Sequence, residues 1–276
     1  MVTTPARLPL TGTPIADVGR RSAALAVWGT EYVRGRIPLE KAVRAIVGSD
    51  FSHVVDGFEP GGPSGPGSAG IDALLVELRR SAADGLRLVL PAPGDPRGLP
   101  GPGAMGDRAL LAGEAVRVQG GSRGYGFVPA ATEHGNADDG HTVTVRWWAF
   151  PGPPASPEPA GTRRQAEHDL TDALRTATSA MSSLDVARLS PEAAAALTQV
   201  RHGRPALRMP AGHPGEGLWA QAERLAAIVD LAASDDGAAY DRAGALARRE
   251  VLRELAAAVR RAKTAAVNAR LDAHPD

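Results

Sequence analysis

The chain has 276 residues, 43% of them apolar, and its 31 arginines and lysines are matched by 31 aspartates and glutamates. Without net charge, the protein has no overall field that would attract nucleic acid or anionic lipid, so neither is an expected partner. The absence of cysteine excludes disulfide bonds, thiolate metal sites and cysteine nucleophiles.

Two domains are expected at this length. The first thirty residues show no secretory signal, and no apolar run reaches the length of a membrane span, about 18 residues. A cytoplasmic protein is therefore predicted. Only Lys41 and Lys263 are lysines, and the excess of Arg, Ala, Gly and Pro is typical of a GC-rich genome, so arginine content alone says little about function.

Three helices are predicted in the first part of the chain. Residues 17–35 form the first, because their apolar side chains recur at spacings of three and four. Pro38 begins a second helix, which ends at Gly48, and residues 71–83 form a third. The side chains that the first helix should bury are those of Leu25, Trp28 and Tyr32.

Strand patterns follow these helices. The longest segment alternates apolar and polar residues, as a half-buried strand does, and the glycine-rich residues 120–124 predict a hairpin turn. We expect residues 1–150 to form an α+β domain, in which helices accompany a small, mainly antiparallel sheet. The predicted strands are 86–90, 114–118, 126–128 and 141–150.

Two stretches rich in Pro and Gly interrupt the chain. Residues 59–70 (EPGGPSGPGSAG) hold nothing that could pack and are predicted to be a flexible insertion. Residues 151–161 (PGPPASPEPAG) are stiffer and favour extended conformations. We place the domain boundary at this second stretch, because the pattern changes across it.

Residues 162–276 give only helix signals. Ser190-Pro191-Glu192 is a good helix start, and residues 234–237 read as a tight turn between two antiparallel helices. A C-terminal α-helical bundle is predicted. Its helices should pack against each other through apolar residues spaced by four and three. These residues form three series, which begin at Leu170, Leu218 and Leu252.

The first candidate site is the loop 91–103, which reads PAPGDPRGLPGPG directly after a predicted strand. Five prolines remove five N–H donors, so the loop is a poor phosphate cradle. It should instead be a stiff loop that presents Asp95 and Arg97. These two residues either bind a polar ligand or pair with each other for a structural purpose, and we favour the structural role.

At this loop the chain resembles uncharacterised proteins of GC-rich actinobacteria. The resemblance spans residues 86–129 and rests on VLPAPGDPRGLPGPG and the later segments GEAVRV and GFVP. It implies that the loop and the following strands form one conserved unit. It implies no activity and transfers no catalytic residue.

The second candidate site is a row of arginines on the last helix, Arg242, Arg249, Arg253 and Arg260. Their spacings of seven, four and seven place them on one stripe, which could bind an acidic partner or phosphate groups. The alternative is a solvated helix face whose charge is softened by neighbouring glutamates. We favour the solvated face.

No catalytic or metal site is predicted. Residues 133–141 combine carboxylates with histidines, but their spacing fits no known metal motif and is ordinary for an exposed turn. No serine lies in a nucleophile elbow, and the seven histidines form no recognisable acid–base pair.

We therefore predict a protein with no cofactor, and we favour a non-enzymatic interaction or regulatory role with a protein partner. The alternative is a small-molecule-binding protein or enzyme that uses the loop at Asp95 and Arg97. The alternative requires a pocket at this loop, whereas the favoured role requires an exposed patch instead.

Overall fold

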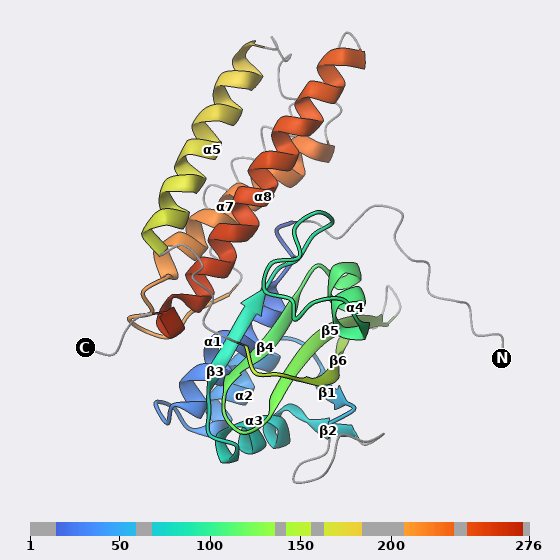
Figure 1. Ribbon diagram of the computed structural model, residues 1–276, viewed down its shortest axis with the longest axis vertical. Helices are drawn as coiled ribbons and strands as arrows, with labels where there is room; N and C mark the ends of the chain where they lie inside the picture. Colours follow the sequence, from blue (N-terminus) through green and yellow to red (C-terminus); the bar gives the residue numbers. More distant parts are fainter. Residues whose placement is uncertain are drawn as a thin grey trace, which may run out of the picture.

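The computed structural model describes residues 15–58, 68–135, 142–155, 163–183, 207–234 and 242–272. Within these ranges it contains seven helices and one six-stranded mixed sheet. Helices precede the sheet and pack on it, and three long helices follow it (Figure 1).

The N-terminal helices are α1 (Arg20–Val33), α2 (Leu39–Val47), α3 (Ile71–Arg80) and α4 (Ala104–Ala112). The sequence predicts the first three, and α2 begins after Pro38 and ends at Gly48 as expected. It does not predict α4, which starts directly after the Pro/Gly-rich loop. That helix has nine residues and buries mainly small ones, so its periodicity is weak.

The strands are β1 (Ser52–Asp56), β2 (Ser68–Gly70), β3 (Ala83–Val89), β4 (Ala115–Gly120), β5 (Gly124–His134) and β6 (Thr142–Gly152). They lie in the order β2-β1-β6-β5-β4-β3. The prediction of a mainly antiparallel sheet is only partly right, because β1 pairs with β6 in parallel. The β4–β5 hairpin turn falls at residues 120–124, as predicted.

Strand β2 occupies the last three residues of the predicted insertion 59–70, which otherwise stays a prediction. Its three residues pair with β1 in antiparallel register, from Val54 with Gly70 to Asp56 with Ser68. Backbone pairing of this kind does not require large apolar side chains, so composition could not reveal it. Residues 59–67 lie outside the described part of the chain.

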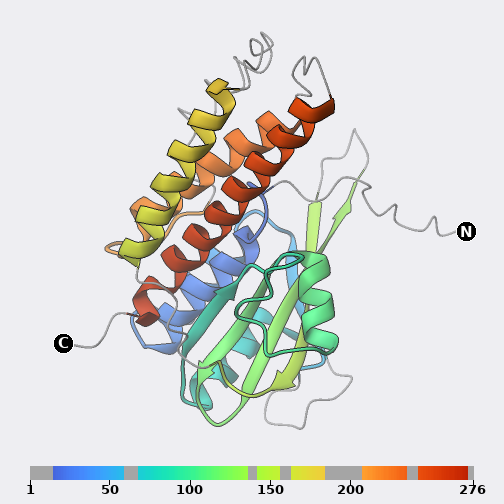
Figure 2. The same cartoon turned by 45° about the horizontal axis from the view of Figure 1, so that its top comes forward.

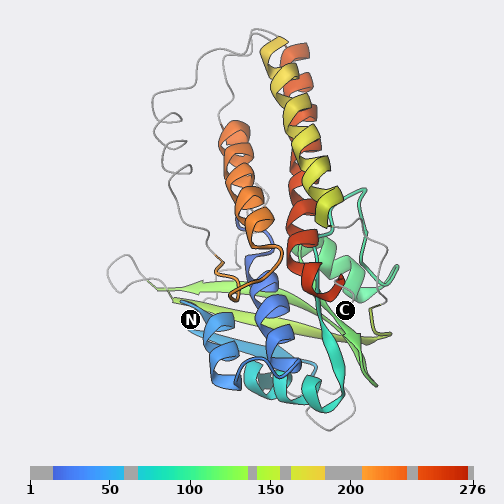
Figure 3. The same ribbon diagram turned by 90° about the vertical axis from the view of Figure 1, so that its left-hand side faces the viewer.

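Helices cover both faces of the sheet. On one face, α1, α2 and α3 pack over a large core that includes Leu86, Leu88 and Trp147. On the other face, α4 packs over Val89 and Val128, where Arg108 also stacks on Trp148 with 4.2 Å between the guanidinium carbon and the ring centroid. The alternation of side chains along each strand produces these two layers (Figure 3).

The C-terminal helices are α5 (Arg163–Ser183), α7 (Glu216–Ser234) and α8 (Arg242–Asp272). The long α8 packs against both α5 and α7, and all three extend beyond the sheet (Figures 1 and 2). They share a small apolar core of their own, so the predicted bundle is present in part. The predicted helix start at residues 190–192 and the turn residues 235–237 lie outside the described residues.

Hydrogen bonds from α7 and α8 reach the start of the described chain. The buried Lys263 of α8 donates hydrogen bonds to the carbonyl oxygens of Ile15, Ala16 and Val18 at 2.8–3.2 Å. Asp230 on α7 accepts the N–H groups of Ile15 and Ala16, both at 2.8 Å. The turn that precedes α1 is thus held by two of the C-terminal helices.

The proposed boundary at residues 151–161 stays a prediction. Pro151 and Gly152 are the last residues of β6, and the Ala155 N–H donates to Val118 O at 2.7 Å. Residues 156–161 are not among those described. No helix in the described part of the chain is long and apolar enough to cross a membrane.

Candidate ligand pocket

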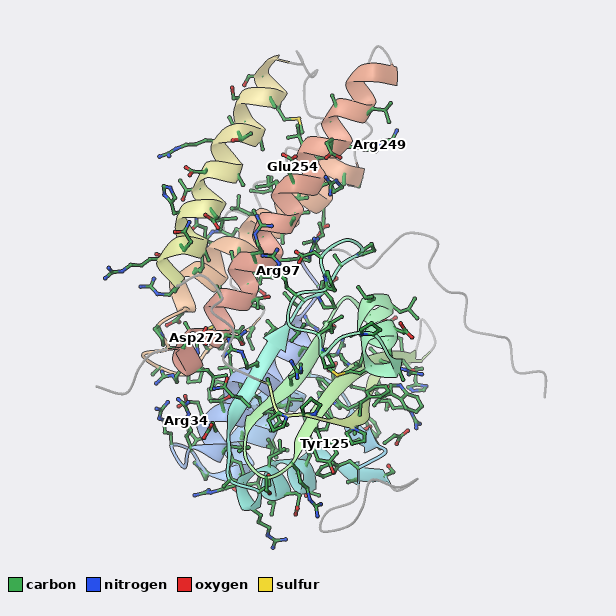
Figure 4. All side chains as sticks on the ribbon, viewed as in Figure 1. Arg34, Arg97, Tyr125, Arg249, Glu254 and Asp272 are labelled. Atoms are coloured by element: carbon green, nitrogen blue, oxygen red, sulfur yellow. The ribbon has the colours of Figure 1, made fainter. Side chains whose placement is uncertain are left out.

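A cavity of about 480 Å³ lies where the end of β3 meets α8. The loop 91–103 forms one wall and the first turns of α5 form another, and the loop runs beside α8 in Figure 4. We call it the β3–α8 cavity. Its polar lining consists of Arg87, Asp95, Arg97, Arg117, Gln165, Asp169, Arg260, Arg261, Thr264, Asn268 and Asp272.

The loop reaches the cavity along a defined path. Ala92 and Asp95 exchange backbone hydrogen bonds of 3.0 and 2.8 Å, which close a tight turn. Gly98 then crosses β3 with a φ of +83°, where a Cβ atom would lie 3.0 Å from a methyl carbon of Val89. Only glycine combines this conformation with this approach.

Asp95 and Arg97 form the pair that the sequence predicts. The Arg97 Nε and Nη2 donate to the two Asp95 carboxylate oxygens at 2.6 and 2.7 Å. These hydrogen bonds hold the pKa of Asp95 below its usual range. Arg97 remains largely exposed at the mouth of the cavity and lies between its loop and α8 (Figure 4).

Two further arginines lie on the floor of the cavity. Arg87 on β3 and Arg117 on β4 are register partners, so their side chains leave the sheet side by side. The Arg87 Nη1 donates to Gln119 Oε1 at 2.8 Å and to Asp272 Oδ1 at 2.7 Å. Arg117 donates to the carbonyl oxygens of Gly98 and Pro153 at 3.1 and 3.3 Å. Both guanidinium groups are therefore fixed in place.

Helix α8 supplies the opposite wall. Arg260, Thr264, Asn268 and Asp272 follow one another at intervals of four residues, so they lie along one side of the helix. The Arg260 Nε is buried and has no hydrogen-bond partner in the described part of the chain. Burial also lowers the pKa of Arg260 from its ordinary value, an effect that the charge of Asp95 opposes.

The structure thus brings Asp95, Arg97 and Arg260 to one cavity, although the sequence assigns Arg260 to a separate stripe. Arg249 and Arg253 lie far along α8 and are exposed. The Arg253 Nε donates to Glu250 Oε2 at 2.9 Å, as the solvated-face alternative expects. The Arg242 side chain is outside the described part of the structure.

Sequence reasoning misses the other lining residues, although the spacing of residues on two helices was a signal for some of them. The interval of four links Arg260 to Asp272 on α8 and Gln165 to Asp169 on α5. The Gln165 Nε2 donates to Asp169 Oδ1 at 2.6 Å. No local signal marks Arg87 and Arg117, since their proximity depends on strand register.

The buried histidines serve the fold. His53 donates from Nε2 to Asp50 Oδ2 at 3.1 Å, because its Nδ1 accepts the Trp147 indole N–H at 3.3 Å. The Nδ1 of His213 accepts the Gly215 N–H at 3.2 Å. Neither lines the cavity. No group of three or more His, Asp or Glu among the described residues could hold a metal ion.

Comparisons with known proteins give one family. The model described as "Rv1486c-like protein, N-terminal domain" matches residues 22–163, and that of the "Rv1486c-like protein, C-terminal domain" matches residues 164–264. Curated proteins and solved structures give no match. The first model contains the loop and both strands of the cavity floor, and the second contains Arg260. Since the two models together span most of the chain, the protein belongs to the Rv1486c-like family.

Proposed function

We propose that the protein binds a small molecule in the β3–α8 cavity. The observation that supports this function is the convergence of the Asp95–Arg97 loop, strand β3 and helix α8 on one hollow of about 480 Å³. Pockets for small ligands usually have volumes of about 300–1,000 Å³ and lie preferentially where two structural units meet. We thus favour a small-molecule-binding role that uses the loop at Asp95 and Arg97 over the protein-interaction role.

The lining of the cavity has the composition of a binding site. Apolar side chains of Ala166 and Ala265 offer surface for the body of a ligand, and the charged groups stand around them. Fixed polar groups against an apolar wall give both affinity and orientation. The three aspartates of the lining each accept a hydrogen bond from another lining residue, Asp95 from Arg97, Asp169 from Gln165 and Asp272 from Arg87. We therefore propose binding as the function of the cavity.

The arginine stripe on α8 supports a partner-binding role less well than the cavity supports ligand binding. Arg260 lines the cavity, and Arg253 is paired with Glu250 on its own helix. The remaining described member, Arg249, is a single exposed arginine, and isolated surface charges contribute little to binding. Protein partners and the oligomeric state stay open to experiment.

The test is a thermal-shift screen of the full chain against a panel of cationic, neutral and anionic metabolites. Ala265→Phe fills the cavity, whereas Ala257→Phe places the same bulk two turns earlier on α8, outside it. Circular dichroism first confirms that both variants fold. A ligand should raise the melting temperature of the wild type and of Ala257→Phe but not of Ala265→Phe. A panel without any stabilising compound, or equal stabilisation of Ala265→Phe, would refute the function.

A further inference from the structure

The β3–α8 cavity concentrates positive charge in a chain that has no net charge. Five arginines and three aspartates line it, which leaves a formal excess of two positive charges. All five cations are arginines, whose planar guanidinium groups match the oxygens of carboxylate and phosphate groups.

The floor of the cavity places like charges next to each other. Arg87 and Arg117 are direct cross-strand partners, an arrangement that normally destabilises a sheet. Arg87 is only 5% exposed, so its guanidinium cannot swing into solvent away from its neighbour. Gln119 and Asp272 hold Arg87, and the carbonyl oxygens of Gly98 and Pro153 orient Arg117. An anion above the pair would relieve the repulsion without moving either side chain.

Arg260 supplies the second, independent observation. Its Nε is buried without a hydrogen-bond partner among the residues that the structure describes, and a buried donor left in this state costs stability. The charged groups that act on it are Asp95, Arg97, Arg253 and Arg261, of which only Asp95 is an anion. Asp95 already accepts both hydrogen bonds of Arg97. Within the described ranges, the wall of α8 thus has a cation that lacks an anionic partner of its own.

We propose that the ligand of the β3–α8 cavity carries a carboxylate or phosphate group, which Arg260 binds together with the Arg87–Arg117 pair. The proposal rests on the small-molecule-binding function and names its ligand class. The apolar part of the ligand lies along Ala166 of α5 and Ala265 of α8. Arg97, neutralised by Asp95, stands at the mouth and contributes less.

The experiment uses three probes with the same four-carbon body: butyl phosphate, butanoate and the neutral butanamide. Binding to the full chain is followed by the NMR signals of the arginine Nε–H groups, which report on Arg260 directly. Arg260→Gln removes the charge and the Nε donor, and Arg249→Gln removes an exposed arginine of the same helix as the matched control.

Both anions should bind the wild type and Arg249→Gln, and the Arg260 signal should shift on binding. Their affinity should fall about 10- to 100-fold in Arg260→Gln, as expected for loss of a hydrogen bond to a charged group. Butanamide should bind all three proteins weakly and equally. The ratio of the two anion affinities then assigns the headgroup as phosphate or carboxylate.

The failures of the two proposals are distinguishable. A neutral ligand that Ala265→Phe rejects and Arg260→Gln accepts would overturn the anion assignment while the binding function stands. Anions that bind Arg260→Gln as well as the wild type would also overturn it. Equal binding of every ligand to Ala265→Phe and to the wild type would overturn both proposals.

Discussion

Asn268 completes the hydrogen bonding of Leu88 in place of a neighbouring strand. Its Oδ1 accepts the Leu88 N–H at 2.9 Å, and its Nδ2 donates to the Leu88 carbonyl oxygen at 3.1 Å. Strand β3 is the edge of the sheet, and on the same edge Thr30 accepts the Leu86 N–H at 2.9 Å. Two side chains, one from α1 and one from α8, therefore close an edge that would otherwise be open to pairing.

The first prediction concerns the two hydrogen bonds between Asn268 and Leu88. Asn268→Leu keeps the size of the side chain but leaves the N–H and the carbonyl of Leu88 without partners. We expect the free energy of unfolding to fall by about 2–4 kcal/mol, because each buried group that loses its partner costs about 1–3 kcal/mol. Urea unfolding measures the loss, and hydrogen exchange of the Leu88 amide should accelerate.

Thr264→Val is the control for that variant. Among the described residues its hydroxyl bonds only to the Arg260 carbonyl within the same helix, at 3.0 Å, so its loss should cost less than about 1 kcal/mol. An equal loss of unfolding free energy in the two variants would show that the hydrogen bonds to Leu88 stabilise the fold no more than a bond within one helix does.

The second prediction concerns Lys263, which is 1% exposed and binds three carbonyl oxygens of the turn before α1. Lys263→Met preserves the length of the side chain and removes all three hydrogen bonds. The expected loss of unfolding free energy is about 2–4 kcal/mol, mainly from unpaired carbonyl groups. Arg249→Met on the exposed face should change it by no more than about 0.5 kcal/mol. A Lys263→Met protein as stable as this control would contradict the role of the contact.

The third prediction concerns pH. Burial, aided by the charge of Arg270, lowers the pKa of His213 from 6.5 to about 4. Between these values the unfolded chain binds a proton that the folded chain does not, so stability falls as the pH drops from about 6.5 to about 4. The largest possible loss from this group is about 3 kcal/mol. Burial also lowers the pKa of His53, which adds to the effect in the same direction.

His213→Asn tests the assignment, since its amide oxygen can still accept the Gly215 N–H but does not titrate. Unfolding measured at several pH values should show a flatter decline for this variant than for the wild type. His168→Asn, which replaces an exposed histidine on α5, is the matched control substitution. An identical slope in the wild type and His213→Asn would locate the acid sensitivity elsewhere.

The fourth prediction concerns Asp95. Its backbone, and not its carboxylate, closes the turn with Ala92, and its partner Arg97 is exposed. Asp95→Ala should therefore lower the unfolding free energy by less than about 1 kcal/mol, the usual limit for exposed ion pairs. The same change adds positive charge to the cavity, so butyl phosphate should bind more tightly. Weaker binding in calorimetry would show that Asp95 contacts the ligand favourably.

The helices were the most predictable part of the fold. Residues of α1, α5, α7 and α8 repeat their apolar side chains at helical spacing over several turns, and that pattern is local. Strands β1 and β2 are short and belong to a sheet whose order departs from the sequence. The parallel pairing of β1 with β6 joins residues about 90 positions apart, such as Val54 and Arg146, and no local pattern encodes it.

The candidate site also combines features that the local sequence encodes with features that depend on tertiary packing. The pairing of Asp95 with Arg97 is local, and the sequence predicts it. Arg260 is one of the arginines that the sequence analysis names, but its separation from Arg249 and Arg253 depends on where α8 contacts the sheet. The opposition of Arg87 and Arg117 depends on the register of β3 with β4, including an irregularity near Gly85. Such features arise from tertiary packing, which overrides the local pattern.

The contact between Asn268 and Leu88 also has a consequence during synthesis. The two residues are 180 positions apart, and ribosomes add about 5–20 residues per second, so Leu88 is made roughly 9–36 s before its partner. Throughout that interval the outer edge of β3 lacks its α8 cover. A nascent sheet with an open edge can pair with another chain, so translation speed and chaperones should govern how much of this protein reaches the folded state.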